Sequence, residues 1–149
     1  MRIILAFLIA FIFYTGPALA QIYVANNDSA TVSIFNDGPD TITIDLDLAP
    51  EDLVVSPDGD FVYVAGNDGS TSVVAVIQTS DNTVIATVDV GSEPTGIAIT
   101  PDGSHLYVAN VENNTVSVIQ TSDNTVVATV DVGNSPIRLA VTTDGDYVF

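Results

Sequence analysis

The 149-residue chain contains no cysteine and a single histidine. Without cysteine there are no disulfides, no thiolate metal ligands and no thiol nucleophile, so an exported domain of this kind must hold together by packing and strand pairing. His105 has no partner base or nucleophile in a recognisable pattern, and acid–base catalysis needs positioned partners. We therefore predict no catalytic residue, and expect His105 to be an exposed strand residue.

Positive charge is almost missing. The chain has two Lys or Arg residues against 19 Asp and Glu, which gives a formal net charge of −17 at pH 7. Such a surface repels phosphate backbones and anionic lipid, so binding of nucleic acid, or of membranes through a basic patch, is not expected. The acidity has two open interpretations: solubility in concentrated salt, or attraction of cations. No calcium-loop or zinc spacing occurs, so we predict no metal site.

The first twenty residues are predicted to be a secretory signal peptide. Arg2 precedes an apolar run over residues 3–13, which is too short to span a bilayer, and Gly16-Pro17 and a small-residue cleavage site follow. Cleavage after Ala20 would leave Arg138 as the only Lys or Arg of the mature chain. The expected location is therefore secreted, periplasmic or cell surface, with no membrane insertion after cleavage; an uncleaved anchor is the alternative.

The remaining chain is repetitive. Residues 77–91 match residues 119–133 at an offset of 42 with one difference, Ile85 against Val127. An earlier, more divergent copy begins at Tyr23. Self-similarity at about 40–50 residues is typical of arrays of identical supersecondary units.

Each complete copy contains four short segments rich in Val, Ile, Thr and Tyr, bounded by turn residues and without helical periodicity. In the clearest copy the strands are predicted at Ile97–Thr100, His105–Ala109, Thr115–Ile119 and Thr125–Val132. Pro101-Asp102-Gly103 predicts a type I hairpin turn followed by a bulge, with glycine at positive φ. Four antiparallel strands per repeat are the signature of a β-propeller blade, so the predicted fold class is all-β, a β-propeller.

These residues also resemble a known family. The segments that carry the resemblance are Tyr107-Val108-Ala109-Asn110, Asn114 to Ile119, Asn124 to Val130, Val132-Gly133 and Pro101-Asp102-Gly103. They look like the YVTN-type propeller repeat of microbial surface-layer and exported proteins, with alanine where that motif has threonine. The resemblance covers nearly all of residues 21–149 and implies a propeller of four-stranded blades, whereas it says little about activity.

The repeat divides the chain into unequal parts: a signal peptide at 1–20, a partial blade at 21–48, blades at 49–90 and 91–132, and the start of a further blade at 133–149. Propellers need about four to eight blades. We therefore expect an incomplete ring, with about three blades present, that would be closed by further blades of a longer protein or by association of several chains.

Three residues are predicted to bind a ligand. Arg138 aligns with Gly96 and Asp52, at the start of an innermost strand, and the resemblance places that loop at the mouth of the central channel. A lone cation there could hold an anionic ligand or pair with a neighbouring carboxylate. Asn110 and Asn26 end the second strands of their copies and are the other two candidates.

Two functions follow as expectations. The first is a non-catalytic exported protein of the cell surface or envelope, a scaffold or binding module for protein or glycan that needs no cofactor. The alternative is a fragment of a propeller enzyme, either a lactonase-like hydrolase or a haem- or quinone-dependent dehydrogenase. The two fullest copies are nearly identical in their channel-facing loops, which favours the scaffold.

Overall fold

The computed structural model describes residues 21–36 and 39–149. The predicted signal peptide lies outside these residues. The first sheet has three strands, β1 (Ile22–Asn26), β2 (Thr31–Phe35) and β3 (Thr41–Asp45), with a one-turn 3₁₀ helix, η1 (Asn27–Ser29), after β1. The second sheet consists of β4 (Ala49–Val55), β5 (Phe61–Asn67), β6 (Ser72–Gln78) and β7 (Thr83–Asp89). The third consists of β8 (Pro94–Ile99), β9 (His105–Asn110), β10 (Thr115–Gln120) and β11 (Thr125–Asp131).

Every strand pairs antiparallel with its neighbour in sequence, so each sheet is a meander. This confirms the all-β prediction. Residues 133–149 carry a single isolated bridge, between Val141 and Val148. No helix of the described residues is long and apolar enough to cross a membrane.

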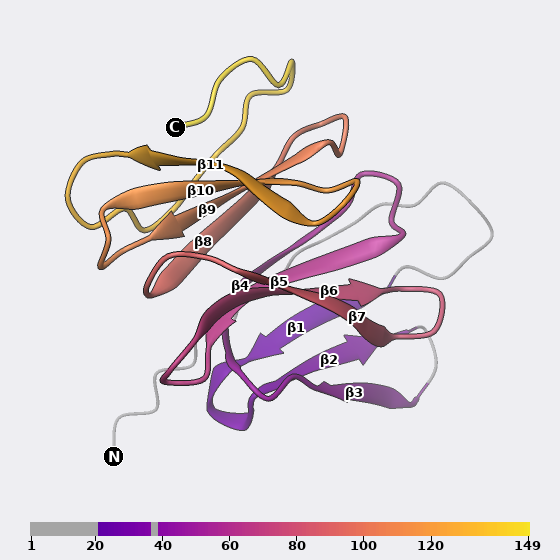
Figure 1. Ribbon diagram of the computed structural model, residues 1–149. Coiled ribbons are helices and arrows are strands. Elements are labelled where there is room, and N and C mark those ends of the chain that lie inside the picture. Colours follow the sequence, from indigo (N-terminus) through magenta and orange to yellow (C-terminus); the bar gives the residue numbers. More distant parts are fainter. Residues whose placement is uncertain (1–20, 37–38) are drawn as a thin grey trace.

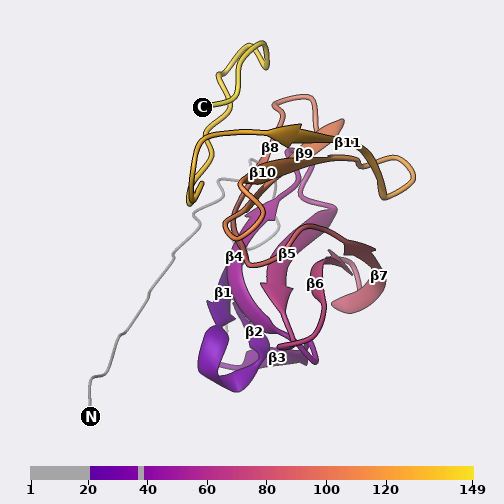
Figure 2. The same ribbon diagram turned by 60° about the vertical axis from the view of Figure 1, so that its left-hand side comes forward.

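The three sheets stack face to face and fan outward (Figures 1 and 2). The second and third sheets approach most closely at their first strands, β4 and β8, and diverge toward their last strands, β7 and β11. The first strand of each complete sheet is thus the inner one. This places the connections that lead into β4 and β8 at a common end of the stack.

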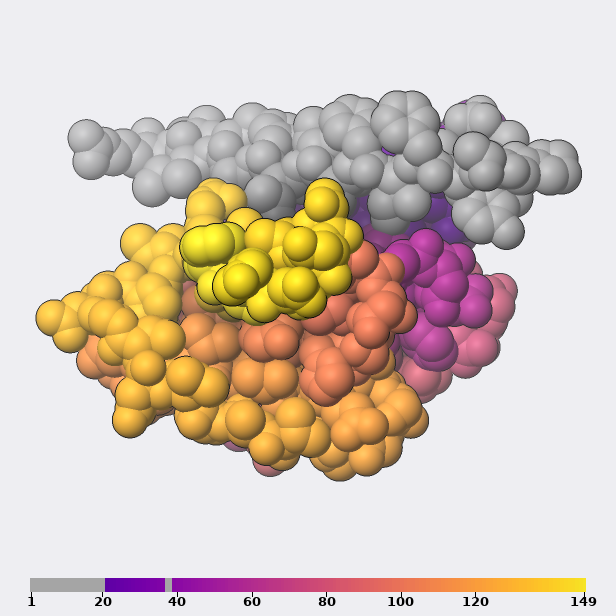
Figure 3. All heavy atoms as spheres, turned by 90° about the horizontal axis from the view of Figure 1, so that it is seen from above, coloured from indigo at the N-terminus to yellow at the C-terminus, as the bar shows by residue number. Residues whose placement is uncertain are grey.

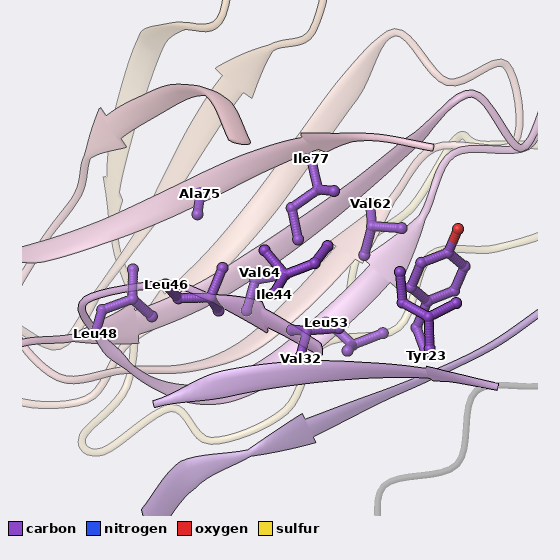
Figure 4. Packing of buried hydrophobic residues seen from close by; sticks show 11 residues of the cluster. Tyr23, Val32, Ile44, Leu46, Leu48, Leu53, Val62, Val64, Ala75 and Ile77 are labelled. Atoms are coloured by element: carbon purple, nitrogen blue, oxygen red, sulfur yellow. The ribbon is translucent and has the colours of Figure 1, made fainter. Parts of the chain in front are cut away.

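Two apolar clusters hold the sheets together. Between the first and second sheets lie Tyr23, Val32, Ile34, Ile44, Leu46, Leu48, Leu53, Val62, Val64, Ala75 and Ile77 (Figure 4). Between the second and third lie Tyr63, Ala65, Val74, Val76, Val88, Ile97, Leu106, Val108 and Ile119. Alternate residues of β5 and β6 belong to different clusters, because successive side chains of a strand point to opposite faces. The second sheet is therefore buried on both faces.

The third sheet is covered on one face by the second sheet and only partly on the other. The C-terminal residues lie against it and leave much of it visible (Figure 3). Val88 of β7 is 6 % exposed, whereas Val130, the matching residue of β11, is 48 % exposed. The outer part of this face therefore has no covering sheet among the described residues.

The innermost strand begins earlier than the sequence predicts. β8 starts at Pro94, where Ile97 was expected, because Pro94 and Gly96 pair with the adjacent residues Asn110 and Ala109 and leave Thr95 as an extra residue. The same irregularity occurs at Pro50 and Asp52 of β4. Such a bulge re-aims side chains at the end of a strand, and apolar periodicity does not detect it.

The turn predictions are confirmed. Gly59, Gly103 and Gly145 have φ of 80°, 75° and 81°, the conformation that the Asp-Gly turns require. Asn82 and Asn124 take left-handed φ of 58° and 55° in the second hairpin of each copy, as expected for asparagine.

The Asp of each first turn is held by a local hydrogen-bond pattern. The Thr100 hydroxyl donates to Asp102 Oδ1 at 2.5 Å and the Ser104 backbone N–H donates to the same oxygen at 3.0 Å. These bonds favour the carboxylate and lower the pKa of Asp102 to about 2. The Asp58 and Asp144 carboxyls accept the same kinds of bond, and their pKa values are also lowered.

We expect these turns to make the protein acid-sensitive. As the pH falls below about 4, these aspartates become protonated in the unfolded chain while they stay ionised in the folded protein. Their contribution to the free energy of unfolding is complete above the unfolded pKa and is therefore lost as the pH falls to about 2. Asp102→Asn should flatten part of this decline in urea unfolding measured from pH 6 to pH 2. Asp45→Asn, at an exposed strand aspartate outside the turns, is the control, and an equal slope in both variants would contradict the prediction.

Candidate ligand site at the inner strands

The three aligned residues Asp52, Gly96 and Arg138 occupy equivalent positions in successive copies of the repeat. Asp52 belongs to β4 and Gly96 to β8, and Arg138 follows in the segment beyond β11. A Cβ on Gly96 would lie 2.5 Å from the Ile137 carbonyl oxygen and 3.0 Å from Arg138 Cα. Only glycine allows the backbone of residues 137–138 to approach β8 this closely.

Thr95, the bulge residue of β8, stabilises the contact between β8 and the backbone of residues 137–138. Its hydroxyl donates to the carbonyl oxygen of Ile137 at 3.2 Å. The bulge thus turns a hydroxyl toward the next inner segment, while Gly96 keeps the space between the two backbones free. Together they fix where the Arg138 backbone sits.

Asp52 joins the second and third sheets. Its Oδ2 accepts the backbone N–H of Ile97 at 3.2 Å and its Oδ1 accepts that of Leu53 at 2.8 Å. Burial raises the pKa of Asp52, while these two bonds and the positive charge of Arg138 oppose the increase. The charge of Arg138 is thus the smallest of the named influences on the pKa of Asp52.

Arg138 is exposed. A guanidinium presents five donors in a planar fork that suits carboxylate or phosphate groups, so an exposed Arg beside a half-buried acid can hold a small anionic ligand. The sequence left two roles open for Arg138, ligand binding or charge pairing. The influence of Arg138 on Asp52 supports a charge interaction, and ligand binding stays a prediction.

Asn110 and Asn26 have similar surroundings but differ in burial. The Asn110 side chain is 0 % exposed, and its Nδ2 donates to Thr115 Oγ1 at 3.0 Å and Ser117 Oγ at 2.9 Å. Asn26 is half-buried and donates to Thr31 Oγ1 at 3.1 Å and Ser33 Oγ at 2.8 Å. Both side-chain amides thus donate their two hydrogens to hydroxyl groups of their own sheets. Direct ligand contact by either residue stays a prediction.

His105 lies at the opposite end of the third sheet, after the turn that follows β8. Its Nδ1 is 2.8 Å from Ser104 Oγ, and the Ser104 hydroxyl also lies 2.8 Å from Asp102 Oδ1. A serine has one hydroxyl hydrogen. Ser104 therefore stands between the acid and the imidazole, whereas in a catalytic triad the histidine stands between the other two.

The family profile described as "Cytochrome D1 heme domain" matches residues 40–144, which is most of the chain. The chain belongs to the cytochrome D1 heme domain family. This match supports the propeller part of the YVTN resemblance, and the YVTN repeat itself stays a prediction. No curated protein matches the sequence.

Solved structures place this heme-domain family member among propellers. Kuenenia stuttgartiensis hydrazine synthase superposes with a TM-score of 0.79 at 27 % identity, over 86 % of this chain and 37 % of that one. A "putative 6-phosphogluconolactonase" from Bacteroides fragilis superposes with a TM-score of 0.72 at 23 % identity, over 87 % of this chain and 40 % of that one. The predicted β-propeller is confirmed, and the chain spans about two fifths of the length of either protein.

A heme implied by the family name needs an axial ligand, which proteins supply from His, Cys, Met or Tyr. At the Pro94 end of the described sheets no such side chain accompanies Arg138. His105 lies at the other end and Tyr147 takes the matching position in the last copy; Tyr107 lies within β9. The two remaining described tyrosines, Tyr23 and Tyr63, are buried between sheets, where burial raises the pKa of each phenol. These residues therefore do not fit an axial heme ligand at this site.

The alignment of the repeats gave Arg138, Gly96 and Asp52 equivalent positions. It did not predict the contacts of Thr95 and Asp52. Neither contact leaves a local signal, because their partners lie 42 and 45 residues along the chain. The Asn-Thr-Ser groups could have been found, since Asn, Thr and Ser recur at identical spacing in two copies.

Proposed function

We propose that this chain supplies blades of an exported propeller enzyme and that Arg138, in the segment after β11, binds an anionic ligand. The observation that carries the proposal is an exposed Arg138 whose positive charge opposes the rise in the pKa of the half-buried Asp52, on a backbone segment that Gly96 allows to approach β8 closely. Membership of a heme-domain family and likeness to two proteins named as enzymes support the enzyme class over a scaffold.

The reaction class is either lactonase-like hydrolysis or a haem- or quinone-dependent dehydrogenation. Because the described residues supply no axial ligand beside Arg138, a bound cofactor would take its ligand from residues other than these. The part of this chain is then to hold a carboxylate or phosphate of the ligand and to orient it toward the channel. Export is proposed from the sequence of residues 1–20 alone.

A ligand screen tests the proposal. The wild-type chain should unfold at higher temperature with phosphate, citrate or 6-phosphogluconate, since a ligand at one hundred times its Kd stabilises a protein by about 2.7 kcal/mol. Arg138→Ala should abolish the response and Arg138→Lys should keep part of it, because a lysine holds the charge without the planar fork. His105→Gln, at the other end of the sheet, is the control.

Two results would contradict this function: no response of the wild type to any of the three anions, or an unchanged response in Arg138→Ala. Either would favour the second candidate, a non-catalytic scaffold of the cell surface or envelope that contacts protein or glycan. One observation supports that candidate. The last strands β7 and β11 expose several large apolar side chains, namely Val84, Ile85, Val126 and Val127.

A further inference from the structure

A hollow of about 460 Å³ lies between the outer halves of the second and third sheets. It is bounded by the connection that leaves β7, by β10 and by β11. Its lining residues are Asp89, Val90, Gly91, Asn113, Thr115, Ser117, Val126 and Thr129. The volume falls in the range of small-molecule sites. The lining combines apolar surface with the polar side chains of Asn113, Thr115, Ser117 and Thr129.

Asn110 sets the chemistry of this lining. It donates one amide hydrogen to Thr115 and the other to Ser117, so both hydroxyl oxygens act as acceptors toward the interior. Each hydroxyl keeps its own hydrogen, and neither donates it to another group of the described residues. Ser117 is 2 % exposed. Two hydroxyl groups that can still donate therefore line the hollow.

The position of Asn110 is fixed by its surroundings. A Cβ on Gly91 would lie 2.6 Å from Asn110 Cγ and 2.7 Å from Asn113 Oδ1, so the glycine backbone lies flat against the amide. Asn113 Oδ1 in turn accepts the Ser92 backbone N–H. The amide, and with it the two hydroxyls, is held by packing on one side and hydrogen bonds on the other.

The equivalent space between the first and second sheets is filled by apolar side chains. There the repeat has Gly66, Val73 and Ala75 in place of asparagine, threonine and serine. Leu48 and Ala75 belong to the apolar cluster of that interface (Figure 4), and Val73 packs against it. A blade can therefore be built with asparagine, threonine and serine at these three positions or with glycine, valine and alanine. The three positions change together between the copies. The polar residues are thus not required for the fold of a blade.

The lining selects among ligands by charge. The strongly negative net charge disfavours an anion. A hard cation prefers several oxygen ligands with free lone pairs, whereas the two buried hydroxyls of this hollow already accept from Asn110. A neutral polyhydroxylated molecule suits both groups, because its hydroxyls can accept hydrogen bonds from Thr115 and Ser117.

We propose that the hollow between the second and third sheets is a saccharide-binding site in which Thr115 and Ser117 donate to sugar hydroxyls. The site uses no residue of the Arg138 region. Failure of the anion screen therefore leaves it untouched, and its own failure leaves the proposed function untouched.

The test is saturation-transfer NMR on the full chain with glucose, galactose, mannose and N-acetylglucosamine as probes. At least one sugar should give a signal with the wild type. Ser117→Ala should weaken its binding about tenfold, the effect of one lost hydrogen bond of ordinary strength. The second sheet has alanine at this position, so the variant should fold; Thr115→Val, which also copies the second sheet, gives a second measurement.

Ser33→Ala is the matched control. Ser33 accepts from Asn26 as Ser117 accepts from Asn110, but it lies in the first sheet, away from the hollow. This variant should lose similar stability and keep wild-type binding. A saccharide signal that Ser117→Ala and Ser33→Ala reduce equally would overturn the proposal, as would no signal with any of the four sugars, which would mean that the hollow holds water only.

Discussion

Gly66→Ala is expected to lower the free energy of unfolding by about 3 kcal/mol, the upper part of the usual range for overpacking a core. A Cβ at this buried position would lie 2.3 Å from the carbonyl oxygen of Ala49 and 2.6 Å from Leu48 Cδ1. The oxygen belongs to the first residue of β4, which pairs with β5, so it cannot move without disturbing that pairing. Urea unfolding at fixed pH measures the change.

Gly133→Ala is the matched control, because a Cβ there has nothing within 4 Å and the residue does not need positive φ. Its free energy of unfolding should stay within about 0.5 kcal/mol of wild type. If Gly66→Ala were equally silent, the close approach of residues 48–49 to β5 would be wrong.

The same glycine shows what the sequence reveals and what it hides. The connection into β4 is two residues shorter than the one into β8, and Gly66 replaces the asparagine of the other copies. Both facts are visible in the sequence. That the short connection needs the glycine becomes visible only when Ala49 is placed against Gly66, since the contact joins residues from neighbouring strands.

Strand identity and turn type were predictable because each depends on residues close in sequence. Alternating apolar residues and Asp-Gly turns determine the meander of each sheet. The contacts between sheets depend on which residues of one copy meet which residues of the next. The bond from Ile97 to Asp52 and the contact of Gly96 with Ile137 therefore required the structure.

Asn110 illustrates a further limit of prediction. It ends the second strand of its copy and was one of the three residues predicted to bind a ligand. The structure buries it completely and engages both amide hydrogens. The sequence signal for this hydrogen-bonded network is that three residues change together between copies, from asparagine, threonine and serine to glycine, valine and alanine.

Ile77→Ala is expected to cost about 3–4 kcal/mol of unfolding free energy, whereas Ile85→Ala in the same sheet should cost less than about 1 kcal/mol. Ile77 is 0 % exposed in the cluster between the first and second sheets (Figure 4), and its truncation leaves a cavity that rigid strands cannot close. Ile85 is 48 % exposed. It is the unpaired residue of a bulge, because Val76 and Ile77 pair with Ala86 and Val84.

The two substitutions remove the same atoms from neighbouring strands, so the difference in unfolding free energy isolates burial from residue type. The bulge also explains the one mismatch between residues 77–91 and 119–133: Ile85 and Val127 both occupy it, and Val127 is 50 % exposed. Valine and isoleucine exchange there because neither packs against a second sheet. Ile85→Val should accordingly leave the free energy of unfolding within about 0.5 kcal/mol of wild type. An equal loss of unfolding free energy in Ile77→Ala and Ile85→Ala would contradict the prediction and show that the last strand of the second sheet is buried against a partner in solution.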